Sequence, residues 1–141
     1  MSNRFISPLL LFLAFFAFSA ESVATNKASG RFYRYVGEGE AAAIRRSGEI
    51  PNVDRLGNSK DVYFTDRLYQ TAGRAKTYNQ LRSKPTYRIE IDPANVSNRS
   101  PFTRVNPGDN PQWGVGGGVE ATTRNAIPVD PSTLTRLRGA P

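Results

Sequence analysis

Cysteine and histidine are both absent from the 141 residues of this chain. Their absence excludes a Ser-His-Asp triad, a Cys-His pair and a two-histidine nuclease, because each of these needs an imidazole or a thiol to carry the proton. A zinc site of thiolates and imidazoles lacks its ligands as well, and no disulfide can stabilise the fold. Any catalysis must therefore depend on carboxylates, Arg, Lys, Tyr and hydroxyl groups.

Residues 1–24 have the composition of an export signal. Arg4 provides a short positive start, and an uncharged apolar run of ten residues follows from Leu9 to Phe18. This run is too short to cross a bilayer, which needs about 20 residues, but its length is typical of a signal peptide. We expect cleavage after Ala24, with Ser19 and an uncleaved anchor as alternatives. The mature protein would then be secreted, without stable membrane association.

The chain is basic, with 19 Lys and Arg against 12 Asp and Glu and a formal charge of +7. Removal of residues 1–24 takes away one base and one acid, so the mature chain keeps this charge. A basic excess can indicate nucleic-acid binding, but the basic residues are spread along the sequence and form no stripe. We therefore do not expect nucleic acid as a partner.

After a polar linker over 25–30, the sequence predicts one α+β domain over 31–138, because its helices and strands do not alternate regularly. Strands are expected at 31–36, 61–65, 86–92, 119–123 and 126–129. One helix is expected at 38–46, ended by Gly48, and a second from the spacing of Leu68, Ala72, Ala75, Tyr78 and Leu81. Loops are expected at 51–60 and 97–118, and a basic tail at 131–141. The loop over 97–118 is long enough to be a binding-loop candidate.

Arg34 lies in the first predicted strand on the same face as two apolar residues, Phe32 and Val36. A charge facing inward needs an anionic partner, because an unpaired buried charge is costly. We weigh two interpretations. The slightly favoured one is a structural ion pair with a nearby acid; the other is a guanidinium fork for a phosphate or carboxylate ligand.

Glu120 follows three glycines, 116–118, which permit close approach of a backbone or a ligand. It is either a solvated strand carboxylate or a carboxylate at the mouth of a cleft. Thr65 either caps the following helix or holds a catalytic carboxylate with its hydroxyl. Four tyrosines could pack in the core or stack on a flat ligand ring: Tyr33, Tyr35, Tyr63 and Tyr69.

Five segments, in this order, resemble the TreTu family, the ADP-ribosyltransferase toxin domains at the C-terminal end of bacterial Rhs polymorphic toxins. They are 33–52, 62–66 (VYFTD), 71–76 (TAGRAK), 86–93 (TYRIEIDP) and 110–123 (NPQWGVGGGVEATT). The resemblance covers nearly all of 31–138. It implies an ADP-ribosyltransferase-like split β-sandwich of two small antiparallel sheets with flanking helices.

The resemblance also implies that the chain cleaves NAD, without a metal, and transfers ADP-ribose to a protein. In that family the acceptor is elongation factor Tu, and translation stops. Glu120 would be the catalytic glutamate, Arg34 would contact the phosphates or ribose, and Thr65 would take the middle position, where many relatives have Ser-Thr-Ser. The residues implied to bind NAD are Arg34, Tyr35, Tyr63, Thr65, Tyr69 and Arg74.

Three other functions stay open from the sequence. An NAD glycohydrolase would use water in place of the protein acceptor, and a metal-independent ribonuclease would fit the basic charge but would lack histidine for proton transfer. A secreted binding module would have the fold of the family but no catalytic activity. Because elongation factor Tu is cytosolic, an exported toxin would act in a recipient cell, and an immunity protein is a further conceivable partner.

Overall fold

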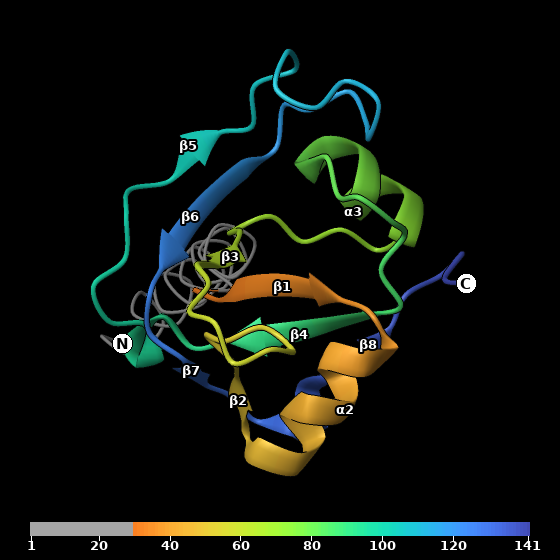
Figure 1. Ribbon diagram of the computed structural model, residues 1–141. Coiled ribbons are helices and arrows are strands. Elements are labelled where there is room, and N and C mark those ends of the chain that lie inside the picture. Colours follow the sequence, from red (N-terminus) through yellow and green to blue (C-terminus); the bar gives the residue numbers. More distant parts are fainter. Residues whose placement is uncertain (1–29) are drawn as a thin grey trace, which may run out of the picture. The chain divides into compact units, whose positions relative to one another are not determined.

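Within residues 30–141, two three-stranded antiparallel sheets and two helices form the architecture (Figure 1). The computed structural model describes residues 30–141, so the predicted export signal and nearly all of the linker lie outside the described residues. Residues 31–141 form one compact unit. The α+β class predicted from the sequence is confirmed.

Strands far apart in the sequence meet in each sheet. The first sheet has the order β1-β4-β8, the second has the order β3-β6-β5, and β2 pairs with β7 in a separate ribbon. The strands are β1 (Phe32–Val36), β2 (Glu49–Ile50), β3 (Val62–Phe64), β4 (Tyr87–Ile91), β5 (Thr103–Arg104), β6 (Val119–Thr123), β7 (Ile127–Pro128) and β8 (Thr135–Arg136). The helices are α2 (Glu38–Ser47) and α3 (Ala72–Asn79), with short 3₁₀ turns at η1 (Pro93–Asn95) and η2 (Pro131–Thr133).

The helix predicted at 38–46 is confirmed as α2. Acidic residues occupy its first turn and basic residues its last turn, which complements the helix dipole. The helix ends at Gly48, whose φ of 70° is the left-handed conformation that glycine adopts without strain. Its inner face buries Ala41 and Ile44 completely.

The start of the second helix differs from the prediction. Helix α3 begins after Thr71, whose hydroxyl accepts a hydrogen bond from the Arg74 backbone N–H as an N-cap. Leu68 lies before the helix and is half-exposed, so its apparent helical spacing to Ala72 was misleading. The suggestion that Thr65 caps this helix is also wrong, because Thr71 fills that role.

The predicted basic tail at 131–141 is part of the fold. Strand β8 pairs with β4, and Leu137 is almost fully buried against α3 residues. The predicted loop at 97–118 likewise contains the short strand β5, which pairs with β6. Two-residue strands leave too little alternation in the sequence for periodicity to identify them.

The alternating side chains of β1 contribute to two separate cores. Tyr33 and Tyr35 pack with Ala72 and Ala75 of α3, while Val36 belongs to the larger core between the sheets and α2. That larger core also contains Ile44, Ile50, Val62, Phe64, Ile89, Ile91, Ala121 and Ile127. Strand β1 is therefore buried on both faces, which fixes the direction of each of its side chains.

In the part of the chain that the structure describes, a backbone bridge joins the two sheets next to the site described below. The Tyr33 N–H donates to the Thr65 carbonyl (2.7 Å), and the Thr65 N–H donates to the Tyr33 carbonyl (2.9 Å). No regular ladder continues from this bridge between β1 and β3 within residues 30–141. The two strands therefore part here, and their split opens a pocket.

Candidate functional site

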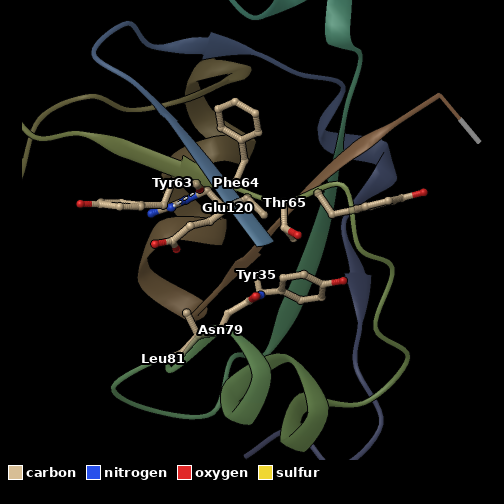
Figure 2. A pocket seen from close by; sticks show the side chains of 9 residues that line it. Tyr35, Tyr63, Phe64, Thr65, Asn79, Leu81 and Glu120 are labelled. Atoms are coloured by element: carbon tan, nitrogen blue, oxygen red, sulfur yellow. Dashed lines mark hydrogen bonds between the residues drawn. The ribbon is translucent and has the colours of Figure 1, made fainter. Parts of the chain in front are cut away.

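The pocket lies where β1 and β3 separate, and residues from four parts of the chain line it (Figure 2). Residues 33–35 of β1 face residues 63–65 at the end of β3, and Glu120 comes from β6. Asn79 is the last residue of α3, and Leu81 lies two residues after it. Figure 2 shows Glu120, Thr65 and Tyr35 around the same space. The sequence-predicted residues Arg34, Tyr35, Tyr63, Thr65 and Glu120 are therefore brought together.

Arg34 forms a bidentate ion pair with Glu40 of α2. Its Nε donates to Glu40 Oε2 (2.7 Å) and its Nη2 to Glu40 Oε1 (2.8 Å), while Nη1 donates to the Tyr63 carbonyl (2.7 Å). The interpretation of Arg34 as a structural ion pair is thus confirmed. A guanidinium has five N–H donors, so two N–H groups of Arg34, a residue that lines the pocket, have no partner within residues 30–141.

Glu40 itself is held as a carboxylate. Burial alone would raise its pKa, but hydrogen bonds and charge from Arg34, with Lys60 at 3.4 Å, outweigh burial and lower the pKa of Glu40 below its usual range. The sequence offered one signal for this partner, the need of an inward-facing arginine for an acid. Glu40 can reach Arg34 because it lies in the first turn of α2, which begins directly after Gly37 at the end of β1.

Sheet register places Thr65 beside Glu120. Phe64 pairs with Ala121 at the last step of the β3–β6 ladder, Thr65 and Glu120 are the next residues at this end, and both line the pocket. The Thr65 hydroxyl accepts a hydrogen bond from the Arg67 backbone N–H (3.0 Å). Its own hydrogen has no acceptor among the described residues, so the buried hydroxyl can donate to a ligand in the pocket.

Glu120 is half-buried and is free to meet a ligand. Within residues 30–141 no group donates a hydrogen bond to its carboxylate and no base forms an ion pair with it. Burial raises the pKa of Glu120, and the negative charge of Asp109 raises it further. A carboxylate in this state can stabilise positive charge that develops beside it and can accept a proton more readily than a solvated one.

This pKa direction predicts the pH dependence of any activity that needs ionised Glu120. As the pH falls, Glu120 takes up its proton above its ordinary pKa of 4.5, so kcat/KM should fall along an acid limb centred above that value. Asp109→Asn removes one of the two causes and should shift the limb to lower pH. A limb at or below 4.5, or one that Asp109→Asn leaves in place, would contradict this assignment.

The tyrosines of the site differ in whether their rings and hydroxyl groups can contact a ligand. Tyr35 is buried, donates to the Arg67 carbonyl (2.8 Å) and accepts from the Tyr69 N–H (2.6 Å), and burial raises its pKa. Its ring lines the pocket, but its hydroxyl is occupied. Tyr63 is half-exposed and lines the pocket, whereas Tyr69 stacks on Tyr78 at 5.6 Å and does not line it.

Three residues show the limits of the sequence-based site. Arg74, implied by the resemblance to bind NAD, is exposed in the first turn of α3 and does not line the pocket. Asn79 and Leu81 do line it and were not predicted as site residues. Asn79 follows the predicted apolar face of the helix by one position, and no local sequence signal distinguishes it from a surface residue.

The glycines before Glu120 let the loop approach the end of α3. The N–H groups of Gly116 and Gly118 donate to the Thr77 and Tyr78 carbonyls at 2.9 and 3.0 Å, which satisfies acceptors that a helix end leaves unpaired. A side chain at Gly118 would overlap the Tyr78 carbonyl. The glycines therefore let the backbone of the loop approach the end of α3, and their hydrogen bonds hold the chain immediately before β6 (Figure 1).

Gln80 holds the same loop with its side chain. It is buried, and its amide donates to the Pro107 and Gly114 carbonyls (3.1 and 3.2 Å) and accepts from the Asn110 N–H (3.1 Å). Gln80→Ala should lower the free energy of unfolding by about 2 kcal/mol, because these buried groups lose their partners. It should also lower kcat/KM, because the loop leads directly into Glu120.

Thermal denaturation and hydrogen exchange of residues 106–118 would measure the effect of Gln80→Ala. The matched control is Gln112→Ala, in the same loop, whose exposed side chain forms no hydrogen bond within the described part of the chain. Equal exchange and equal stability in the two variants would show that Gln80 does not hold the loop.

Within residues 30–141 no group of three or more His, Cys, Asp or Glu side chains could hold a metal ion. No helix in this part of the chain is both long and apolar enough to span a membrane.

No family model matches the sequence, and neither the curated proteins nor the solved structures contain a significant match to it.

Proposed function

We propose that this protein is a mono-ADP-ribosyltransferase toxin with an ADP-ribosyltransferase-like split β-sandwich fold. One observation carries the proposal: Arg34, Thr65 and Glu120, which are far apart in the sequence, line one pocket at the split between β1 and β3. The pocket supplies unused donors from Arg34 and Thr65 and an unpaired carboxylate from Glu120. These groups suit a ligand that carries hydroxyl groups and develops positive charge.

In the proposed reaction, the bond between nicotinamide and ribose C1′ breaks, and its electron pair stays on the nicotinamide nitrogen. The ribose then has oxocarbenium character, as in glycoside cleavage. The Glu120 carboxylate stabilises this charge, and the hydrogen-bond donors of Arg34 and Thr65 orient the ligand. The acceptor nucleophile attacks C1′ and loses its proton, for which the raised pKa of Glu120 is suitable.

The size of the pocket limits what can enter it. The cavity has a volume of about 40 Å³, far below the several hundred Å³ of sites that enclose a drug-sized ligand. We therefore propose that only the nicotinamide end of NAD enters the split, while the adenosine half lies outside it. The protein acceptor would then approach from the open side.

Incubation of the purified protein with NAD labelled in the adenylate part and a bacterial lysate tests this function. A labelled protein of the size of elongation factor Tu is the expected result, because the acceptor is proposed from the resemblance to TreTu domains. Label on other proteins would keep the transferase and change the acceptor. Loss of NAD without labelled protein would favour an NAD glycohydrolase, and intact NAD with the folded protein would refute both enzymes.

A further inference from the structure

A groove that shares no lining residue with the pocket lies between α2 and the loop over 51–60. Its volume is about 510 Å³, more than ten times that of the pocket and within the range of sites that enclose a small-molecule ligand. Gly39, Ala43 and Arg46 follow one face of α2 along the groove, and the first two are small enough to leave it open. The reaction described above assigns no role to this groove.

Three basic side chains line the groove, and two of them have no partner among the described residues. Arg46 comes from the last turn of α2 and Arg55 from the loop. Both are exposed, and within residues 30–141 neither forms an ion pair or a hydrogen bond. The third, Lys60, is 3.4 Å from Glu40. The groove therefore offers a ligand two guanidinium groups whose N–H donors no described residue uses.

The two acidic residues that line the groove do not cancel this charge. Glu40 is held by Arg34 in the bidentate ion pair described above. Asp54 accepts hydrogen bonds from the N–H groups of Leu56 and Asn58 at 2.8 and 2.9 Å, so its carboxylate is occupied in the turn of the loop. With Arg34 included, four bases stand against two acids, which leaves a charge of +2 around the groove.

The positions of Arg46 and Arg55 suit a ligand that is held from two sides. Arg55 Nη2 lies 4.0 Å from the point that a Cβ on Gly39 would occupy, so its guanidinium lies over the first turn of α2. Arg46 is about 10 Å further along the same helix. Because helical side chains tilt toward the N-terminus, Arg46 can extend across the hollow toward Arg55. A ligand with two adjacent anionic groups can meet both guanidinium groups.

We propose that the groove binds a diphosphate group. Arg46 and Arg55 each form a bidentate pair with one phosphate, a geometry for which guanidinium groups are suited. Lys60 adds a third positive charge, and the apolar side chains of Pro51 and Val53 contact the organic part of the ligand. This binding goes beyond the proposed function and does not depend on it.

The source of the diphosphate does rest on the proposed function. One ion pair connects the groove with the pocket, because Arg34 lines the pocket and its partner Glu40 lines the groove. The diphosphate belongs either to substrate NAD, whose nicotinamide end enters the pocket, or to a second nucleotide that does not enter it. The two sources present the same chemistry to the groove, and they differ in whether they compete with NAD.

Calorimetric titration of the full chain with inorganic pyrophosphate and with ADP-ribose measures the binding. Arg46→Gln and Arg55→Gln should each weaken the binding of both ligands by at least about 10-fold, the usual effect of losing a hydrogen-bonded contact with a charged group. Arg45→Gln is the matched control, because Arg45 precedes Arg46 on α2, lies against the Tyr87 ring at 4.9 Å and does not line the groove. Its binding of both ligands should stay within about twofold of the parent.

Initial rates of NAD cleavage with added pyrophosphate distinguish the two sources. A higher KM for NAD at unchanged kcat would assign the groove to the diphosphate of the substrate, and a changed kcat would assign it to a second nucleotide. Absence of binding by the parent, equal binding by the two folded arginine variants, or an equal loss in Arg45→Gln would overturn the inference and leave NAD cleavage standing. Pyrophosphate binding that depends on Arg46 and Arg55, in a protein that does not cleave NAD, would refute the proposed function and retain the groove.

Discussion

Glu120→Gln should reduce ADP-ribose transfer by at least about 100- to 1,000-fold, the usual cost of removing one group that stabilises charge in a transition state. The amide keeps the shape of the side chain but cannot carry the negative charge that the breaking bond requires. Because Glu120 has no hydrogen-bond or ion-pair partner within residues 30–141, the substitution disrupts no structural contact. NAD affinity should therefore change by less than about threefold.

Initial rates of label transfer and of nicotinamide release, measured with calorimetric binding of NAD, would separate these effects. Glu49→Gln is the matched control, because Glu49 is exposed on β2 and does not line the pocket. If Glu120→Gln retained more than a tenth of the transfer rate with unchanged binding, Glu120 would not be the catalytic carboxylate.

Glu40→Ala should have the largest effect on stability. It leaves the guanidinium of Arg34, whose side chain is only 18% exposed, without its anion. Breaking one partner of a buried pair typically costs about 3–5 kcal/mol, and the residual exposure of this pair places it near the lower end, about 3 kcal/mol. For a domain of this size, the corresponding fall in Tm is about 10–20 °C.

Glu38→Ala is a stringent control for this prediction, because Glu38 lies in the same helical turn. Its contact with Arg136, at 3.6 Å, is between exposed side chains, so its loss should cost well under about 1 kcal/mol. The double variant Arg34→Met with Glu40→Ala should regain part of the lost stability, since no buried charge is left unpaired. A fall in Tm no larger for Glu40→Ala than for Glu38→Ala would refute the role of the pair.

The pH dependence of stability gives an independent check on the same pair. Because the pKa of Glu40 is lowered in the folded state, its contribution is fully present above the ordinary pKa of 4.5 and is lost as the pH falls through the folded-state value. The difference in unfolding free energy between the protein and Glu40→Ala should therefore shrink in acid.

Local patterns in the sequence were sufficient to predict the helices and the longer strands. The acid-to-base order and Gly48 mark α2, and the alternation of Tyr87, Ile89 and Ile91 marks β4. A short polar segment such as β8, which pairs with a strand far along the chain, carries no local signal that identifies it as a strand. Leu68 shows the opposite error, a helical spacing without a helix.

The sequence was sufficient to single out two charged residues of the site, but it did not show which other residues the fold brings next to them. Arg34 and Glu120 attract attention because a charge beside apolar strand residues needs a reason. Asn79 and Glu40 could not be found in this way, because the contact of Asn79 with the pocket and that of Glu40 with Arg34 depend on how α3 and α2 pack in the fold. Neither polarity nor spacing distinguishes such residues before the chain is folded.

The strand β8 lies next to the end of the chain, yet its backbone pairs with β4, and Leu137 beside it fills the core against α3. The first sheet is therefore completed only when two segments that are distant in the sequence meet. Because β4 also pairs with β1, the wall of the pocket that β1 provides belongs to a sheet that local contacts alone cannot assemble.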